Sequence, residues 1–222
     1  MSPRASVLVV AKAPVPGLAK TRLSPAVPPE QAADIAAASL LDTLDAVLAT
    51  PDVVPVVALT GDLTKAKRSR EIRSLLRRVV LVPQRGPDFA TRLVNAHADA
   101  AYLNADLPVV QIGMDTPQVT AELLDECVGS LRHVECALGL ATDGGWWALG
   151  LRDGYRAGAL RTVPMSRDDT GALTAAALKR SGLRIGLLPE LSDVDDMATA
   201  RVVAASLPGS RFAEALLVGA LR

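Results

Sequence analysis

A group of cations around a glycine is the first feature of the chain that could do chemistry. Lys12, Lys20 and Arg22 lie within residues 11–23, AKAPVPGLAKTRL, which follow a short apolar run. Gly17 allows a tight turn, and backbone N–H groups beside cations can hold a di- or triphosphate. The segment contains neither GK[ST] nor G-x-G-x-x-G, so a surface loop with solvated Lys and Arg side chains is the alternative.

A single carboxylate at the end of a predicted strand is the second feature. Asp115 follows the apolar run 108–113 within QIGMDTP. A carboxylate in that place is a suitable ligand for a hard cation such as Mg²⁺. Alternatively, Thr116 or Thr120 caps the next helix and Asp115 is merely a polar loop residue.

Three more acids lie close together towards the C-terminus. Asp193, Asp195 and Asp196 belong to SDVDDM, just before a predicted helix. Acids are common at helix N-termini, where they cap the backbone and interact with the helix dipole. The cluster is therefore either a helix start or, if the fold brings it near Asp115, a second attachment point for a metal ion.

A glutamine beside a glycine suits the organic part of a ligand. Gln84 and Gly86 lie in QRGPDFATRL, with Arg92 one turn into the following helix. A glutamine amide can read a nucleobase edge, and a glycine lets the base approach the backbone. An ordinary surface loop is the alternative.

A glycine turn followed by two tryptophans is the last such segment, ATDGGWWALGL. Asp143, Gly144 and Gly145 could form a hairpin turn and no more. Trp146 and Trp147 are the only tryptophans of the chain, and in a strand they point to opposite faces. One can therefore enter the core while the other lines a cleft, where an aromatic face suits a sugar ring or a base.

Alternating strands and helices are predicted to position these segments. Continuous apolar runs predict strands buried on both faces, and apolar residues at helical spacing predict helices. The predicted strands cover 7–11, 53–60, 79–83, 108–113, 136–142, 146–151 and 184–189. The predicted helices cover about 30–49, 63–78, 88–103, 119–130, 168–180, 196–206 and 210–221.

This order of elements predicts one α/β domain over residues 1–222, built on a mostly parallel mixed sheet. The alternation in the first half favours parallel strands, and the short DGG connection favours an antiparallel pair. Ligands bind beyond the carboxyl ends of the strands in open sheets of this kind. We therefore expect the loop after the first strand, the QRGPD loop and the GMDTP loop on one rim.

Composition excludes several classes of protein. Lys plus Arg is 24 and Asp plus Glu is 24, so the chain lacks the basic excess of an electrostatic nucleic-acid binder. No apolar run approaches the roughly 20 residues of a membrane span. The two cysteines, Cys127 and Cys136, are too few for a disulfide scaffold. We expect a cytoplasmic protein that binds neither nucleic acid nor a membrane.

The order of these motifs resembles a bacterial GT-A-like family. KAPVPGLAKTRL, Q-x-G with a following Arg, G-x-D-x-P, DGGWWALGL and D-V-D occur in succession over about residues 7–199. The resemblance is to nucleotide-diphospho-sugar transferases of the arsenosugar or selenodomain-associated type. It extends more distantly to nucleotidyltransferases that activate phospholactate or the molybdenum cofactor. The implied fold is a GT-A-like, Rossmann-like three-layer sandwich.

The resemblance implies a role for each motif. The phosphates of a nucleotide would lie at Gly17, Lys20 and Arg22, and its base near Gln84 and Gly86, with Lys12 and Arg92 as further candidates for binding the nucleotide. Mg²⁺ or Mn²⁺ would bind Asp115, with Asp193 or Asp195 as a second anchor. The acceptor side would consist of Asp143, Gly144, Gly145 and Trp146. The chain departs from the family at Trp146 and Trp147, where tyrosines are usual, and at Met165–Ser166, where Trp-Ser is common.

The expected reaction is metal-dependent transfer from a nucleotide-activated donor to a small-molecule acceptor. Lys20 and Asp115 would stabilise the leaving phosphate, and Asp143 would be the general base. Transfer of a sugar from a nucleotide diphospho-sugar is the first expectation. The alternatives are nucleotidyl transfer from an NTP to a phosphorylated acceptor and nucleotide binding without turnover.

Overall fold

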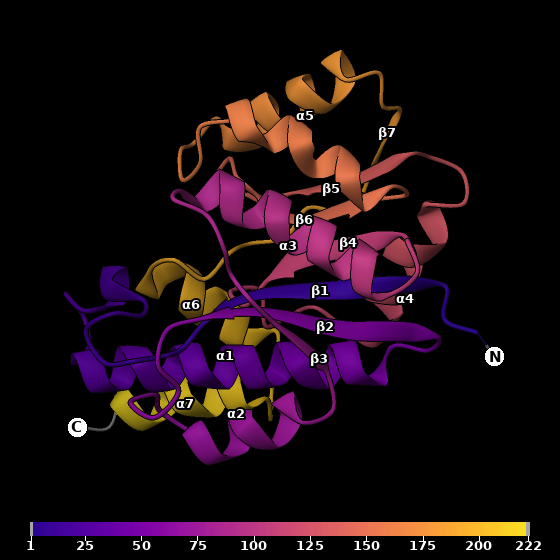
Figure 1. The fold of residues 1–222 in the computed structure, drawn as a ribbon. Helices are drawn as coiled ribbons and strands as arrows, with labels where there is room; N and C mark the ends of the chain where they lie inside the picture. Colours follow the sequence, from indigo (N-terminus) through magenta and orange to yellow (C-terminus); the bar gives the residue numbers. More distant parts are fainter. Residues whose placement is uncertain (1, 221–222) are drawn as a thin grey trace.

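The computed structural model describes residues 2–220 of the chain (Figure 1). The strands are β1 (Ala5–Lys12), β2 (Val53–Thr60), β3 (Val80–Pro83), β4 (Val109–Gly113), β5 (Cys136–Leu140), β6 (Trp146–Leu151) and β7 (Ile185–Leu187). The α-helices are α1 (Pro29–Ala49), α2 (Ser69–Leu76), α3 (Phe89–Leu103), α4 (Ala121–Ser130), α5 (Thr170–Arg180), α6 (Met197–Ala205) and α7 (Arg211–Ala220). Two 3₁₀ helices are η1 (Thr21–Leu23) and η2 (Gly154–Thr162).

All seven strands form one sheet in the order β3-β2-β1-β4-β6-β5-β7. β6 runs antiparallel to its neighbours β4 and β5, and the other pairs are parallel. Helices cover both faces of the sheet (Figure 1). The predicted α/β sandwich with a mostly parallel mixed sheet, including its antiparallel pair, is confirmed.

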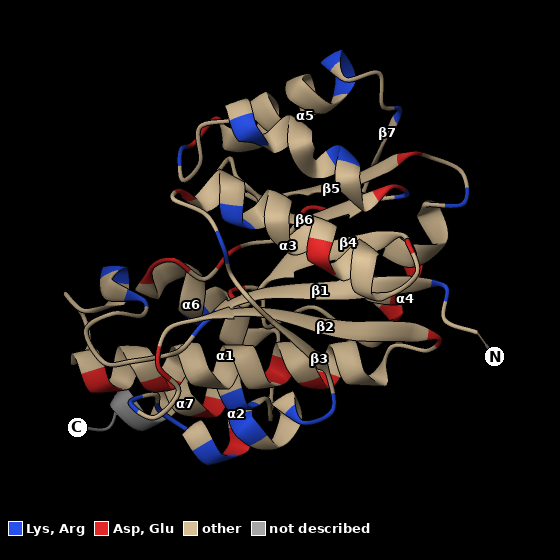
Figure 2. Cartoon of the chain, viewed as in Figure 1, with Lys and Arg blue, Asp and Glu red and all other residues tan. Residues whose placement is uncertain are grey.

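The hydrophobic core has a separate cluster on each face of the sheet. Side chains of α1, α2 and α4 pack on one face, and side chains of α3, α5 and η2 pack on the other. A third cluster joins the outer side of α1 to α6 and α7. Charged residues lie mostly on the helices and loops, and the central strands carry few (Figure 2). Within residues 2–220, no helix is long and apolar enough to cross a membrane.

One rim of the sheet collects the loops that the sequence singled out. β1 to β4 are parallel, and β5 and β7 run in the same direction as β4, so the carboxyl ends of all six strands lie at this rim. The loops that follow β1, β3, β4, β5 and β7 carry Lys20, Gln84, Asp115, Asp143 and Asp193, respectively. The prediction of a common rim is confirmed.

Several element boundaries differ from the prediction. The helix predicted over residues 63–78 is confined to Ser69–Leu76, because residues 62–68 form turns and Arg68 is left-handed with φ 48°. The strands predicted over 136–142 and 184–189 end at Leu140 and Leu187. No sequence pattern predicts η2, whose first turn begins where the Asp153 side chain accepts a hydrogen bond from the Tyr155 N–H.

Candidate active site

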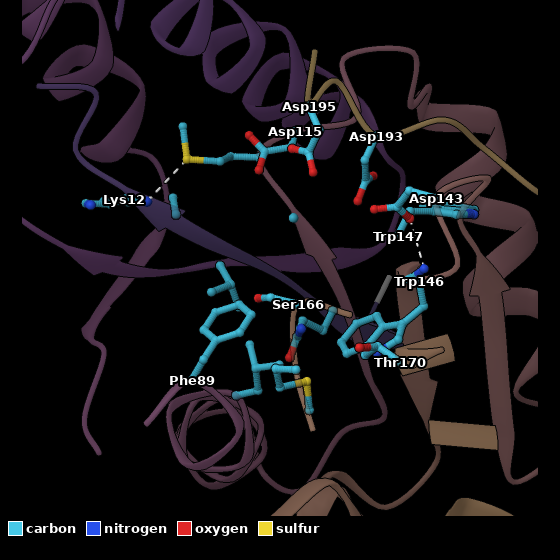
Figure 3. A pocket seen from close by; sticks show the side chains of 18 of the residues that line it. Lys12, Phe89, Asp115, Asp143, Trp146, Trp147, Ser166, Thr170, Asp193 and Asp195 are labelled. Atoms are coloured by element: carbon cyan, nitrogen blue, oxygen red, sulfur yellow. Dashed lines mark hydrogen bonds between the residues drawn. The ribbon is translucent and has the colours of Figure 1, made fainter. Parts of the chain in front are cut away.

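Two neighbouring cavities lie at the carboxyl-terminal rim of the sheet. Figure 3 shows side chains that line one of them, the larger. The larger has a volume of about 750 Å³ and extends from the end of β3 to the start of β6. The smaller, about 460 Å³, lies against the loop that follows β1. Six residues line both cavities: Lys12, Arg22, Met114, Asp115, Ser166 and Asp195. Asp115 and Asp195 therefore lie where the two cavities meet.

Lys20 joins carboxylates from two distant segments at this junction. Its Nζ atom is 3.0 Å from Asp115 Oδ1 and 3.0 Å from Asp195 Oδ1. Arg22 Nη1 lies 2.8 Å from Asp195 Oδ2. Burial alone lowers the pKa of Lys20, but the attraction of Asp115 and Asp195 outweighs burial and raises the pKa above its usual value. The ammonium is therefore charged, and it is largely buried with a side-chain exposure of 9%.

The carboxylates exceed the cations that pair with them. Asp115, Asp143, Asp193 and Asp195 all line the larger cavity. Asp143 and Asp193 make no ion pair with any residue from 2 to 220. Burial raises the pKa of Asp193 to about 7, and repulsion from Asp115 and Asp143 adds to the increase. The site thus has an excess of negative charge that a bound cation would relieve.

The backbone holds the acidic loop against the end of β4. The Val194 N–H donates to the Asp115 carbonyl oxygen over 3.0 Å. Gln118 Nε2 donates to the Ser192 carbonyl oxygen over 2.6 Å. These bonds place Asp193 and Asp195 beside Asp115 although nearly 80 residues separate them in the sequence.

The structure shows which of the predicted acids caps a helix. Asp196 Oδ1 accepts a hydrogen bond from the Thr199 N–H and caps α6. Thr120 caps α4 by accepting from the Leu123 N–H. Capping therefore accounts for Asp196 but not for Asp193 or Asp195, and Asp115 is not the cap of α4.

The loop after β3 closes the larger cavity at the end that lies opposite β6. Gln84 Nε2 donates to the Ala11 and Ala58 carbonyl oxygens over 2.8 and 3.0 Å, which fixes the side chain above β1 and β2. Its amide nitrogen is thus engaged by the backbone, and Oε1 is the atom left to accept a bond from a ligand. Arg92 Nε donates to the Gly86 carbonyl oxygen over 3.2 Å, which ties the loop to α3.

Glycines shape the turn between β5 and β6. Gly144 has φ 86°, and a Cβ atom there would lie 1.8 Å from the Asp168 carbonyl oxygen. Only glycine fits so close to the start of α5, where the Gly171 N–H donates to the Gly144 carbonyl oxygen over 2.8 Å. The Gly145 N–H donates to Asp143 Oδ1 over 2.9 Å and orients that carboxylate towards the cavity (Figure 3).

The two tryptophans point to opposite faces of the sheet, as predicted. Trp147 is 1% exposed in the core below α1 and α4, and its Nε1 donates to the Pro189 carbonyl oxygen over 2.9 Å. Trp146 lies on the other face and lines the larger cavity together with Phe89 (Figure 3). The aromatic rings lie across the cavity from the four carboxylates.

Most of the predicted site residues are brought together by the fold. The two cavities are lined by Lys12, Lys20, Arg22, Gln84, Arg92, Asp115, Asp143, Gly145, Trp146, Asp193 and Asp195. Gly17, Gly86 and Gly144 line neither cavity. All three have positive φ, of 75°, 144° and 86°, so the structure explains them as turn residues, and contact with a nucleotide stays a prediction for them.

Other residues lining the larger cavity were not predicted as site residues. Among them are Phe89, Gln111, Met165, Ser166, Arg167, Asp168 and Thr170. The sequence carried a signal for one of them, because Gln111 interrupts the apolar run VVQIG. Ser166 has φ 61°, a strained value for a residue other than glycine, and this could not be seen in the sequence.

No three His, Cys, Asp or Glu side chains among residues 2–220 converge on one point as a ready metal site. The Lys20 ammonium lies between Asp115 and Asp195 instead. Cys127 and Cys136 line neither cavity. Both are free and buried, and burial raises the pKa of each thiol to about 12.

Residues 43–167 match the family model of uncharacterized proteins conserved in bacteria, DUF2064. The chain belongs to the DUF2064 family. The matched segment covers more than half of the chain and includes Gln84, Asp115 and Asp143, but not Lys20 or the acidic loop before α6. No curated protein matches the DUF2064 chain at a significant level.

Solved structures show that this DUF2064 chain shares its fold with nucleotide-using transferases. A proposed nucleotide-diphospho-sugar transferase from Desulfovibrio desulfuricans G20 is 25% identical, with a TM-score of 0.83 over 98% of this chain and 94% of that one. CMP:2-keto-3-deoxy-manno-octonic acid synthetase with CTP is 12% identical, with a TM-score of 0.56 over 91% and 98%. The manganese complex of Rv0371c from Mycobacterium tuberculosis H37Rv is 18% identical, with a TM-score of 0.53 over 91% and 100%. At 12% and 18% identity, the last two show the fold alone.

Proposed function

We propose that the protein is a metal-dependent transferase with a nucleotide-activated donor, and that it moves a sugar from a nucleotide diphospho-sugar to a small acceptor. The observation that carries this proposal is the position of Lys20 Nζ, 3.0 Å from Asp115 and 3.0 Å from Asp195, where a basic and an aromatic cavity meet. A diphosphate beside Lys12, Lys20 and Arg22 would leave its sugar in the larger cavity. Similarity to the Desulfovibrio protein over nearly the whole chain supports this assignment.

The carboxylates at the junction fit a divalent cation. They offer only oxygen ligands, which Mg²⁺ and Mn²⁺ prefer. Together with Asp143 and Asp193, which also line the larger cavity, they carry more negative charge than Lys20 and Arg22 can balance. Asp115, with Asp193 or Asp195, would hold the ion. When bound, such an ion neutralises negative charge on a leaving phosphate.

In sugar transfer, the cations of the first loop would stabilise the leaving group and Asp143 would accept the proton of the acceptor. The acceptor oxygen forms a bond to the anomeric carbon, and the bond from that carbon to the diphosphate oxygen breaks. The bonding electron pair leaves with the nucleoside diphosphate, whose charge Lys20 and Arg22 stabilise. The acceptor proton passes to Asp143, which the Gly145 N–H holds at the cavity wall.

Nucleotidyl transfer is the second candidate, favoured by the lone carboxylate after β4. Asp115 follows Gly113 and Met114, so the chain has no D-x-D pair at this place. In this reaction an acceptor phosphate oxygen forms a bond to the α-phosphorus of an NTP, and pyrophosphate leaves. A phosphate acceptor is already ionised and needs no general base, so Asp143 would not take part in catalysis.

Product release tests the proposal and separates the two reactions. The protein is incubated with Mg²⁺ or Mn²⁺, a panel of NTPs and nucleotide diphospho-sugars, and a panel of sugar and phosphate acceptors. Release of a nucleoside diphosphate supports sugar transfer, and release of pyrophosphate from an NTP supports the second candidate. Tight binding with no turnover over the whole panel supports a non-catalytic nucleotide-binding protein.

The role of Asp115 is tested by thermal shift. We expect Asp115→Asn to abolish the metal-dependent rise in Tm that a nucleotide causes, with little change in the Tm of the free protein, because its carboxylate is 40% exposed. Asp125→Asn is the matched control, since Asp125 pairs with Arg4 outside both cavities. A wild-type protein that shows no metal-dependent shift with any nucleotide would contradict the proposed function.

A further inference from the structure

A buried polar side chain on β4 forms part of the floor of the larger cavity. Gln111 is 2% exposed, yet it lines the cavity. Its Oε1 atom is buried and has no hydrogen-bond partner among the described residues. Buried polar groups in folded proteins nearly always have partners. An unpartnered amide in the otherwise apolar strand VVQIG therefore points to a partner that arrives with a ligand.

The sheet determines where Gln111 lies in the cavity. Val110 and Ile112 belong to the core cluster below α1, so the alternation of side chains places Gln111 on the opposite face, below α3 and α5. In the sheet it is paired with Leu149 of β6. Trp146 lies nearer the rim than Leu149: the two residues face Leu140 and Leu138 of β5, which are about 7 Å apart along that strand. The cavity thus has an aromatic wall near its mouth and an amide at depth.

This pair of residues is separate from the place assigned to the base. Gln84 comes from the loop after β3 and its amide is fixed above β2 and β1, on the β3 side of β4, whereas Arg92 belongs to α3. Gln111 and Trp146 belong to β4 and β6, which are neighbours. One ligand that spans the cavity would therefore place different chemical groups at its two ends.

The chemistry of the β4–β6 end matches a sugar ring. An indole offers an apolar face for the C–H face of a ring, and an amide both accepts and donates hydrogen bonds, as ring hydroxyls do. We infer that Gln111 is a specificity-determining residue whose side-chain amide forms a hydrogen bond with a hydroxyl of the donor's sugar, whose ring packs against Trp146. The inference rests on the proposed function and names the part of the donor that this end of the cavity selects.

The test compares matched ligands on one variant. Calorimetric titration with Mn²⁺ present measures the Kd of UDP and UDP-glucose, of UDP and UDP-N-acetylglucosamine, and of GDP and GDP-mannose. For each sugar nucleotide that the wild-type protein binds, we expect Gln111→Leu to raise the Kd about tenfold, and to change the Kd of the matching nucleoside diphosphate less than twofold. The Tm of the free variant should equal or exceed that of the wild type, because the substitution removes an unpartnered buried amide.

Ser6→Ala is the matched control. Ser6 of β1 is fully buried, its Oγ atom has no partner among the described residues, and it does not line either cavity. The control should change neither Kd. If Gln111→Leu loses affinity equally for the sugar nucleotide and for the nucleoside diphosphate, the inference is overturned, and Gln111 contacts the nucleotide instead.

Three other results would also overturn the inference. They are unchanged Kd values in Gln111→Leu, a fall of several degrees in its Tm, and binding of nucleoside diphosphates by the wild type without binding of any sugar nucleotide. These results leave the nucleotide site itself intact. A wild-type protein that binds no nucleotide at all would instead remove the proposed function, and the inference with it.

Discussion

The two cavities of the site differ in what holds their walls in place. The smaller cavity is formed by loop residues whose side chains are fixed by charge, above all by the contacts of Lys20 with Asp115 and Asp195. The larger cavity is formed by side chains that also belong to the hydrophobic core, such as Val10 and Leu93. Charge contacts can be exchanged for those of a ligand, whereas core packing resists change.

This difference indicates how each cavity would meet a ligand. A polyphosphate that enters the smaller cavity can take over Lys20 and Arg22 from the carboxylates, which would then be free to hold a cation. The larger cavity keeps its shape and selects the group that fits it. The smaller cavity, at the first loop, would thus recognise a ligand by its charge, and the larger cavity, which reaches β6, would recognise it by its shape.

The largest expected effect comes from removing the cation between the cavities. Lys20→Met keeps the bulk of the side chain and should weaken nucleoside diphosphate binding about 100-fold, because a charge-assisted hydrogen bond to phosphate is lost. It should also lower the free energy of unfolding by about 1 to 2 kcal/mol, since Asp115 and Asp195 are left to repel each other but stay partly solvated. Calorimetric titration and urea unfolding measure the two effects.

Lys67→Met serves as the control for that experiment. Lys67 pairs with Glu30 over 3.2 Å and lines neither cavity, so its loss should leave nucleotide affinity unchanged. Equal nucleotide affinity of Lys20→Met and wild type would contradict the view that the smaller cavity binds phosphate through charge.

A second effect, of intermediate size, concerns α3, which supplies one wall of the larger cavity. His97 lies on α3, is fully buried, and neither ring nitrogen has a hydrogen-bond partner among the described residues. Burial lowers its pKa from 6.5 to about 3. Between these values the unfolded chain binds the extra proton, so the folded state loses stability as the pH falls through this range.

Urea unfolding at several pH values measures this loss. Between pH 7 and pH 5, the protonation of His97 in the unfolded chain should lower the free energy of unfolding by about 2 kcal/mol, from a slope of up to about 1.4 kcal/mol per pH unit. His97→Met should lose this pH-dependent fall in the free energy of unfolding. His133→Met, which changes an exposed histidine, should still show it. Equal pH dependence in all three proteins would show that α3 is not held by a neutral buried histidine.

The smallest effect separates two neighbouring acids of the run SDVDDM. Asp196→Ala removes the cap of α6 and should lower the Tm by about 2 to 4 °C without changing nucleotide affinity. Asp195→Asn should weaken metal-dependent nucleotide binding with a smaller effect on the Tm. Thermal shift with and without nucleotide measures both, and a reversed pattern would place the functional acid at position 196.

The architecture was predictable because its signals are local. Buried runs such as VVPVVALT and WWALGL predicted β2 and β6 with their observed bounds. The DGG turn predicted the antiparallel pair of β5 and β6. The helix at residues 63–78 was predicted too long, since turns at residues 62–68 precede Ser69. The 3₁₀ geometry of η2 left no apolar period to detect.

The candidate site was predictable in part, for a related reason. Residues after the carboxyl ends of parallel strands must share a rim, which predicts that Asp115 lies near the first loop. The sequence could not tell which acid of SDVDDM pairs with Lys20 and which one caps α6. That choice depends on backbone bonds, such as that from Val194 to Asp115, which join segments far apart in the chain.

The amino-acid sequence by itself determined the strands, the helices and the edge of the sheet where the polar loops gather, because hydrophobic period and strand direction fix these. Only the tertiary structure decided that Lys20 lies between two carboxylates and that Gln111 is buried without a partner. Both depend on the exact approach of side chains from separate elements. Distances of this kind decide charge and hydrogen bonding, and no pattern along one segment contains them.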